Sequence, residues 1–170
     1  MELKLETICA LATGSGIGAI AVVRISGADA RKILSQCFSK DLSKAQSHTI
    51  HFGTISGKDD TQIDEVLVSY FEHGRSFTGE ESIEISCHGS PYVQQQILAV
   101  LQQCGCRMAE PGEFTKRAFI SGKLDLSQAE AVADLIAAQS KKAHRIALSQ
   151  LKGNLSSDLK VLRESLIAFA

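Results

Sequence analysis

The sequence lacks a hydrophobic run long enough to cross a bilayer, because no stretch approaches the roughly 20 apolar residues that a membrane helix needs. It also lacks the basic and then apolar order of a secretory signal, since it opens with Met-Glu-Leu-Lys-Leu-Glu. We therefore expect a cytoplasmic protein that makes no use of a membrane.

The sequence also has no large excess of positive or negative charge. The chain has 18 Lys and Arg against 19 Asp and Glu, a net charge of −1. This balance excludes bulk attraction to nucleic acid, so any RNA contact must come from a local patch or from a segment outside the chain. With 44% apolar and 22% charged residues, the 170-residue chain has a globular composition and suffices for one domain and part of another.

The common nucleotide-binding loops are also missing. The glycine-rich segment 14–18 does not match G-x-G-x-x-G, and it leads into a Val- and Ile-rich strand instead of a helix. A Gly-Lys pair at 122–123 is followed by Leu124, so it is not the end of a P-loop motif. We expect this chain to bind no nucleoside triphosphate by itself.

Metal-binding cysteine patterns are equally weak. Of the five cysteines only Cys104 and Cys106 form a closely spaced pair, and no second pair accompanies it. An odd number of cysteines without an export signal favours reduced thiols, and cysteine is among the residues most often buried. We expect no metal site.

The first part of the chain alternates between strand-like and helix-like segments. Val- and Ile-rich runs predict strands at 7–11, 19–26, 49–56, 63–71 and 82–87. The glycine-rich turn between the first two predicts a hairpin, and polar residues at 57–60 predict a turn between the third and fourth.

Helices are predicted at 28–37, from Pro91 to about Cys104, and at 113–121. Ser90 and Pro91 are typical of a helix start, and Ser127 to Glu130 matches a capping box. From residue 140 to 170 the pattern stays helical, with leucines at steps of three or four between 148 and 166. Because this apolar stripe lacks a partner and a terminal cap, we expect the N-terminal piece of a longer protein.

These segments predict an α/β (α+β) domain with a mixed sheet at residues 1–121, followed by the start of an all-α domain at 122–170. The charged stretch 111–136, interrupted by glycines, lies at the expected junction. Junctions between domains are common places for ligand pockets.

Three residues are candidates for such a pocket. Arg24 lies in a strand among apolar residues, and an internal salt bridge is the simplest explanation of a partly buried guanidinium. Glu84 alternates with two serines, and its carboxylate could accept paired hydrogen bonds from an amidine-like heterocycle edge. Lys123 lies in a loop. Together these residues would suit one ligand with both donor and acidic groups.

His88 follows a predicted strand and precedes a predicted helix start. This position suits an anion site, but it suits a capping or packing histidine equally well. No Ser/His/Asp set and no carboxylate pair can be placed by spacing, so we expect no catalytic residue in this chain.

Six segments, in the same order, resemble the MnmE (TrmE) family of tRNA-modification GTPases of bacteria and organelles. They are ICALAT (8–13), VVRISG (22–27), SFTGEE (76–81), IEISCHG (83–89), PGEFTKRAF (111–119) and GKLDLSQAEAVADLI (122–136). The last segment is the most specific of them.

The resemblance implies an N-terminal domain similar to the folate-binding domain of aminomethyltransferases. Such a domain dimerises and binds a tetrahydrofolate derivative, 5-formyl- or methylene-tetrahydrofolate, as one-carbon donor. It further implies a helical domain interrupted by a GTPase domain that uses GTP, Mg²⁺ and K⁺. With MnmG, an FAD protein, members of this family modify the wobble uridine of tRNA at carbon 5.

The family's folate contacts correspond to Arg24, Glu84 and Lys123 in this sequence. The first loop departs from the family pattern, because it reads Thr-Gly-Ser-Gly where proline is common. The P-loop, the switch regions and the C-terminal cysteine motif have no counterpart here, so we expect no GTP hydrolysis by this chain alone.

Two other functions remain open at this point. One is a folate-dependent transferase that works without a GTPase. The other is a structural dimerisation module without a ligand, in which Arg24 and Glu84 only pair with each other. Ligand binding separates the second from the folate-binding functions.

Overall fold

The computed structural model describes residues 6–153, 162–165, 167 and 169 of the chain. These residues form two compact units, Met1–Phe114 and Thr115–Ala170, which are described separately below. The division falls inside the helix Glu113–Ile120. The expected domain boundary after residue 121 stays a prediction.

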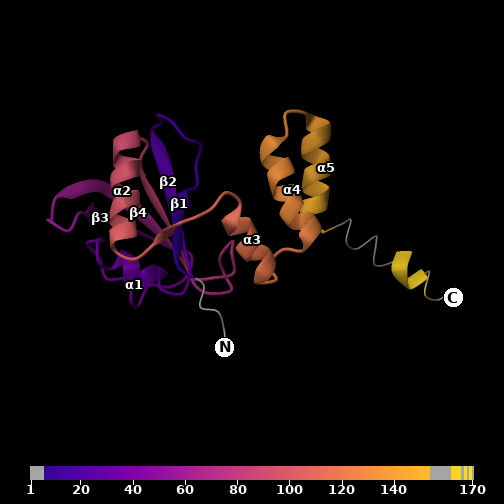
Figure 1. The fold of residues 1–170 in the computed structure, drawn as a ribbon, viewed down its shortest axis with the longest axis horizontal. Coiled ribbons are helices and arrows are strands. Elements are labelled where there is room, and N and C mark those ends of the chain that lie inside the picture. Colours follow the sequence, from indigo (N-terminus) through magenta and orange to yellow (C-terminus); the bar gives the residue numbers. More distant parts are fainter. Residues whose placement is uncertain (1–5, 154–161, 166, 168, 170) are drawn as a thin grey trace. The chain divides into compact units, whose positions relative to one another are not determined.

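The first unit is built on one six-stranded sheet (Figure 1). Its strands are β1 (Ile8–Leu11), β2 (Ile20–Ser26), β3 (Thr49–Ser56), β4 (Gln62–Phe71), β5 (Ser82–His88) and β6 (Arg107–Met108). All five predicted strands are present, with bounds that shift by one residue at some ends. The short β6 adds a sixth strand that the sequence pattern did not predict.

The strand order in the sheet is β3-β4-β5-β2-β1-β6. Strands β1 and β2 pair antiparallel, which confirms the predicted hairpin. Strands β3, β4 and β5 are also joined antiparallel, whereas β6 runs parallel to β1. The sheet is therefore mixed, as predicted. The pairing of β2 with β5 joins segments about 60 residues apart in the sequence, with Arg24 opposite Glu84.

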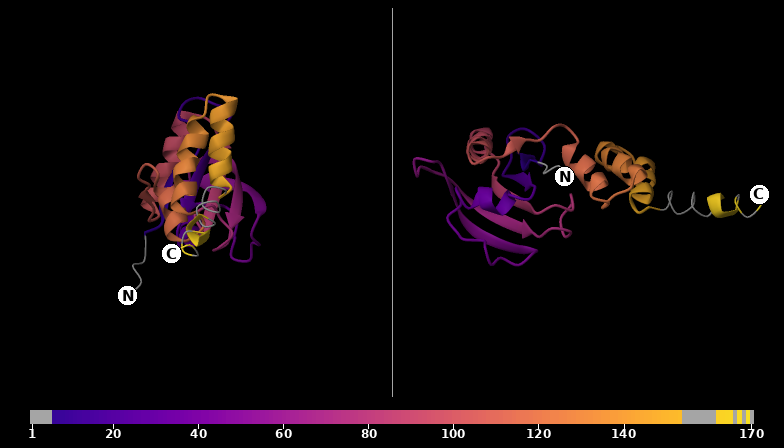
Figure 2. Two further views of the ribbon diagram at one scale, coloured as in Figure 1. Left: turned by 90° about the vertical axis from the view of Figure 1, so that its right-hand side faces the viewer. Right: turned by 60° about the horizontal axis from the view of Figure 1, so that its bottom comes forward.

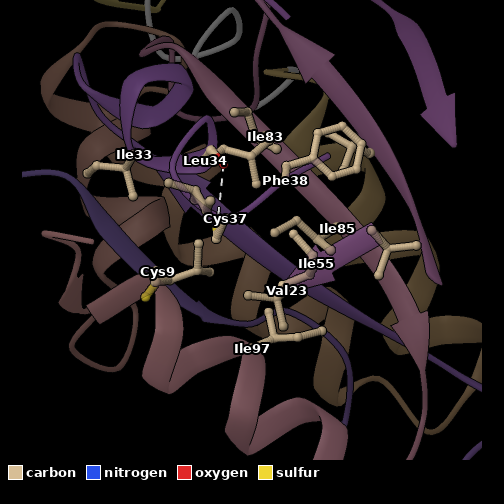
Figure 3. Packing of buried hydrophobic residues seen from close by; sticks show 14 of the residues in the cluster. Cys9, Val23, Ile33, Leu34, Cys37, Phe38, Ile55, Ile83, Ile85 and Ile97 are labelled. Carbon is tan, nitrogen blue, oxygen red and sulfur yellow. Dashed lines mark hydrogen bonds between the residues drawn. The ribbon is translucent and has the colours of Figure 1, made fainter. Parts of the chain in front are cut away.

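Two helices lie on one face of this sheet: α1 (Ala30–Leu34) and α2 (Pro91–Gln103). The right-hand view of Figure 2 shows α2 nearly end on, to one side of the strands. The side chains of Val23, Ile85 and Ile97 are fully buried between sheet and helices, and Figure 3 shows them packed together. Because successive strand residues point to opposite faces, the alternate residues Arg24, Glu84 and their neighbours lie on the other face.

Helix α1 is shorter than the predicted helix 28–37. The chain leaves the helix after Leu34 and turns, so that Phe38 forms an isolated antiparallel bridge with Ile55. The Phe38 ring then covers Gly53, where an added Cβ would lie 2.5 Å from the ring. Burial of this ring against β3 ends the helix, and a local pattern could not reveal that contact.

Helix α2 begins where predicted, at Pro91, but Ser90 makes no side-chain capping bond. The helix start is held instead by Pro91, which needs no hydrogen-bond partner for its nitrogen, and by the preceding Gly89. Gly89 packs against Gly18 so closely that a Cβ would lie 2.3 Å from the Gly18 carbonyl oxygen. Two backbone hydrogen bonds join the same segments, from Gly18 N–H to Gly89 and from Gly89 N–H to Ala19.

The second unit contains most of α3 (Glu113–Ile120), together with α4 (Leu126–Ala137) and α5 (Lys141–Leu151). Helices α4 and α5 lie side by side (Figure 1). Their contact buries two small residues, Ala131 and Ala147, and Gln128 Nε2 donates to the Leu151 carbonyl at 2.9 Å. This bond joins the start of α4 to the end of α5, so the two helices run antiparallel.

Two predictions for this unit were wrong. The capping box is formed by Asp125 and Gln128, not by Ser127 and Glu130, and α4 begins at Leu126. The carboxylate of Asp125 accepts the Gln128 backbone N–H, and the Gln128 side chain accepts the Asp125 N–H. The single helix expected from 140 to 170 ends at Leu151, because Gly153 adopts a φ of 79°.

The leucine stripe of the predicted long helix is only partly described. Leu148 and Leu151 are half-buried in α5, and Leu162 is 57% exposed. Leu155, Leu159 and Leu166 lie outside the described residues. Within the described part of the chain, none of the helices combines the length and the apolar character needed to cross a membrane.

We predict that Gly89→Ala destabilises the first unit by about 2 kcal/mol, because its Cβ would overlap the Gly18 backbone and the strand end would have to shift. Urea denaturation of the variant measures this loss. Gly14→Ala is the matched control, since nothing lies within 4 Å of its Cβ position. Equal stability of both variants would show that the contact between Gly18 and Gly89 does not constrain the fold.

Candidate ligand-binding site

An ion pair between Arg24 and Glu84 lies on the sheet face opposite the helices. The Arg24 Nε and Nη2 atoms both donate to Glu84 Oε1, at 3.0 and 2.8 Å. The side chains of Arg24 and Glu84 are 22% and 31% exposed. The structure therefore brings together two of the three predicted site residues.

This pairing leaves hydrogen-bonding capacity on both side chains. In the part of the chain that the structure describes, no hydrogen bond is made by Arg24 Nη1 or by Glu84 Oε2. The ion pair thus keeps one donor group, on Arg24, and one acceptor atom, on Glu84, that no described residue uses. Such a pair suits a flat heterocycle that carries an N–H donor next to a carbonyl acceptor.

Aromatic rings fix the position of the guanidinium. The Arg24 Cζ atom lies 5.2 Å from the ring centre of Phe77 and 5.4 Å from that of Phe114. Contacts of this kind are attractive because the ring faces carry negative charge. These aromatic residues were missed by the sequence analysis, although Phe77 belongs to the SFTGEE segment that carries the family resemblance.

The loop that carries Phe77 is anchored by a buried network of hydroxyl groups. Ser26 Oγ lies 2.7 Å from Thr78 Oγ1 and donates to Glu80 Oε2 at 2.7 Å. Ser82 Oγ lies 3.2 Å from Thr78, and Ser76 Oγ donates to the Glu80 carbonyl at 2.6 Å. Because the network ties the loop to β2 and β5, it keeps Phe77 beside Arg24.

A second cluster holds the end of this loop. Glu81 accepts hydrogen bonds from Arg31 Nη2 and from the Tyr70 hydroxyl, both at 2.8 Å, while the Arg31 Cζ lies 4.7 Å from the Tyr70 ring centre. Burial, followed by the hydrogen bond to Glu81, raises the pKa of Tyr70 from 10 to about 12. The hydroxyl of Tyr70 is thus held as a donor to Glu81.

Residues of β2, β4 and β5, and of the loop between β4 and β5, surround a small pocket beside the Arg24–Glu84 pair. It has a volume of about 180 Å³ and is lined by Arg24, Phe71, Arg75, Ser76, Phe77, Ser82 and Glu84. Sites that enclose a drug-sized ligand have volumes of roughly 300–1,000 Å³. The pocket therefore has room for one ring system, and a longer ligand would extend from it along the sheet.

Lys123 lies in the second unit, in the turn between α3 and α4. The turn is closed by hydrogen bonds from the backbone N–H groups of Lys123 and Leu124 to the Ala118 carbonyl, and Gly122 takes a φ of 72°. The Lys123 side chain is exposed. Its predicted role beside Arg24 and Glu84 stays a prediction.

The cysteines form no disulfide, and four of the five are buried. Burial, together with the neighbouring Cys104, raises the pKa of the Cys37 thiol to about 12. A thiol in this state is a poor nucleophile and a poor metal ligand. Among the residues that the structure describes, no group of three or more His, Cys, Asp or Glu side chains could hold a metal ion.

Comparison with known protein families identifies the chain. The family model described as GTP-binding protein TrmE N-terminus matches residues 7–123, and the model described as MnmE helical domain matches residues 126–170. The chain belongs to the MnmE (TrmE) family. The first match contains the whole sheet and the Arg24–Glu84 pair, and the second contains α4 and α5.

Curated relatives agree with this assignment. The chain is 56% identical over 169 residues to the tRNA modification GTPase MnmE of Flavobacterium johnsoniae, covering 97% of the chain and 36% of that protein. It is 52% identical over 170 residues to the protein of the same name in Parabacteroides distasonis, with 97% and 37% covered. For Porphyromonas gingivalis the identity is 49% over 167 residues, with 95% and 35% covered. The chain thus spans little more than a third of these relatives.

We predict that stability falls between about pH 10 and pH 12 as Tyr70 loses its proton. The pKa of this group is raised by folding, so its contribution is complete below pH 10 and is lost as the pH rises towards 12. A rise of the pKa from 10 to about 12 corresponds to about 3 kcal/mol. Denaturation of wild type and Tyr70→Phe at pH 9 and pH 11.5 measures it, and an equal fall in both proteins would exclude Tyr70 as the cause.

Proposed function

We propose that this chain is the folate-binding and dimerising part of a tRNA-modification GTPase. Membership of the MnmE family supports the general role. The observation that carries the folate site is the Arg24–Glu84 pair, which lines a ring-sized pocket and leaves Glu84 Oε2 and Arg24 Nη1 without a hydrogen bond in the described chain.

The chemistry of the pair fits the ring end of a reduced folate. Glu84 Oε2 accepts from the N–H groups at the edge of the pterin, and Arg24 Nη1 donates to the neighbouring carbonyl oxygen. Phe71 and Phe77 contribute the apolar walls of the pocket. The bound folate, 5-formyl- or methylene-tetrahydrofolate, supplies a one-carbon group.

The direct contact of Arg24 with Glu84 limits what Arg24 can bind. Two groups joined at 2.8 Å act on the same end of a ligand. We therefore assign both to the ring, and Arg24 does not bind the carboxylate tail at the far end. Lys123 is the third proposed contact, as a cation from the turn that follows α3.

The dimer is proposed to form through the open face of β3 and β4. Ile50, Phe52 and Leu67 are 66%, 55% and 46% exposed there, and Phe52 pairs with Leu67 across the two strands. An apolar patch of this kind favours burial, and a second copy related by a two-fold axis would bring the same residues together.

The remaining steps belong to the full-length protein. We propose that it hydrolyses GTP with Mg²⁺ and K⁺ in a GTPase domain, and that it acts in the cytoplasm with the FAD protein MnmG. Its substrate would be tRNA, modified at carbon 5 of the wobble uridine. The sequence described here carries no P-loop motif, so its own share is the folate site and the dimer contact.

One observation favours a second candidate function. Because Arg24 and Glu84 neutralise each other, the pair would also be stable as a structural salt bridge in a dimerisation module without a ligand. The same pocket would equally serve a folate-dependent transferase that works without a GTPase. Ligand binding decides against the structural module, and a GTPase domain in the full gene product decides against the transferase.

We predict that Glu84→Gln weakens binding of 5-formyltetrahydrofolate at least tenfold, because an amide NH₂ would face the ring N–H groups in place of an accepting oxygen. The variant keeps the shape of the side chain and one acceptor for Arg24. Isothermal titration calorimetry of the chain and of the full-length gene product measures the effect.

Lys123→Met is expected to weaken the same binding, while Lys40→Met, at another exposed position, serves as the control. Circular dichroism checks that each variant is folded. If wild type and Glu84→Gln bind the folate equally, or if neither the chain nor the full-length protein binds it, the Arg24–Glu84 pair is structural.

We further predict that Phe52→Glu converts the dimer to a monomer, because a carboxylate in the apolar patch would have to be buried without a partner. Sedimentation equilibrium measures the change in mass. Tyr92→Glu is the control, since Tyr92 is 70% exposed on α2, away from the open face. A Phe52→Glu variant that remains dimeric would exclude this surface as the interface.

A further inference from the structure

A histidine at the end of β5 and a buried carboxylate of β4 form a second polar pair. His88 Nδ1 lies 2.7 Å from Asp64 Oδ1, and the His88 backbone N–H donates to Asp64 Oδ2 at 2.8 Å. The Asp64 side chain is 10% exposed, whereas that of His88 is 72% exposed. A buried carboxylate thus holds an imidazole that itself faces solvent.

The hydrogen bond to Asp64 determines which nitrogen of the His88 ring can bind a ligand. Because Asp64 is an acceptor, the Nδ1 atom of His88 carries the proton, and Nε2 is the nitrogen left for another partner. No hydrogen bond to Nε2 comes from any residue that the structure describes. The backbone bond to Asp64 already secures the end of β5, so the bond to Nδ1 serves to orient the ring.

The backbone at His88 is also held in place. The following residue, Gly89, is clamped between Gly18 and Ala19 by two hydrogen bonds and by direct contact with the Gly18 backbone. Groups that bind ligands need such support, because a mobile side chain loses entropy when it binds. His88 therefore differs from an ordinary surface histidine.

His88 lies on the same strand as Glu84, at a distance that an elongated ligand can span. Glu84, Ser86 and His88 alternate along β5 and lie on the same face of the sheet. At 3.3 Å per residue, His88 lies about 13 Å along the strand from Glu84. Between them Ser86 is flanked by Val22 on β2 and by Leu67 on β4, which gives a small and partly apolar surface.

We propose that His88, oriented by Asp64, binds the carboxylate at the far end of an elongated ligand whose ring lies at Glu84. This assignment rests on the proposed folate function. Folate-type ligands have a heterocycle at one end, an aromatic linker and a glutamate tail. Arg24 is committed to the ring end, so the tail must meet other groups. Besides the proposed contact with Lys123, His88 is the group that β5 itself supplies.

The groups around the ring determine which partner it can bind. An imidazolium ring held by Asp64 through Nδ1 donates from Nε2 to a carboxylate. Asp64 and Glu65 are the acidic groups of β4 at this end, with Glu65 on the same face as Leu67. On β2 the residue opposite His88 is Ile20, and segment 13–18 has no ionisable side chain. Cys87 points to the opposite face, where it is buried.

The test compares two ligands that differ only in the charge of the tail. Calorimetry at pH 6 measures binding of 5-formyltetrahydrofolate and of its diamide, in which both glutamate carboxylates are neutral carboxamides, to the full-length protein. We expect His88→Gln to weaken binding of the folate about tenfold, the effect of one charge-assisted hydrogen bond, and to leave binding of the diamide unchanged.

The control is His144→Gln, which removes an exposed histidine of α5. Retained binding of the diamide shows that the His88 variant is folded. If His88→Gln binds both ligands like wild type, or loses both equally, the assignment of His88 is wrong while the folate site stands. If wild type binds neither ligand, the proposed folate function fails, and this assignment with it.

Discussion

The antiparallel register of β2 and β5 is the constraint on which the site depends. It sets Arg24 directly opposite Glu84 and, on the other face, Val23 opposite Ile85. Because side chains alternate with a period of two, a shift by one residue would bury the charged pair under the helices and expose the core. Hydrophobic burial against α1 and α2 therefore fixes the same register that places the ion pair.

Because the helices cover only one side of the sheet, the sheet has a covered face and an open face. The covered face is largely apolar, with Val23, Ile55, Ile83 and Ile85 fully buried. The open face changes along the sheet, from the apolar residues of β3 and β4 to the charged and hydroxylic residues of β2 and β5. This gradient is compatible with two neighbouring uses, a contact between copies and a ligand.

The buried polar groups of the described chain are fully paired. Among the described residues, no buried side-chain nitrogen or oxygen lacks a hydrogen-bond partner. The carboxylates of Glu80, Glu81 and Asp64 each accept bonds from side chains of other elements. Such networks are costly to bury but rigid once satisfied. They hold the loop with Phe77, and also His88, in fixed positions, which a binding surface requires.

The sequence alone determined the elements that depend on local chemistry. Alternating Val and Ile predicted the five longer strands, Pro91 predicted the start of α2, and family motifs pointed to Arg24 and Glu84. Local sequence patterns did not predict the features that depend on contacts between distant residues. The Phe38 ring on Gly53 shortens α1, and the hydroxyl network around Thr78 shapes the pocket loop.

Tertiary structure decided which groups meet. The register of strands some 60 residues apart turned two separate candidates into one ion pair, and the Asp64 carboxylate turned a histidine of uncertain role into an oriented one. Hydrophobic periodicity depends only on the order of residues within one segment, so the sequence predicts which face of a strand is buried. Partners across a sheet are set by the packing of the whole core, which no single segment encodes.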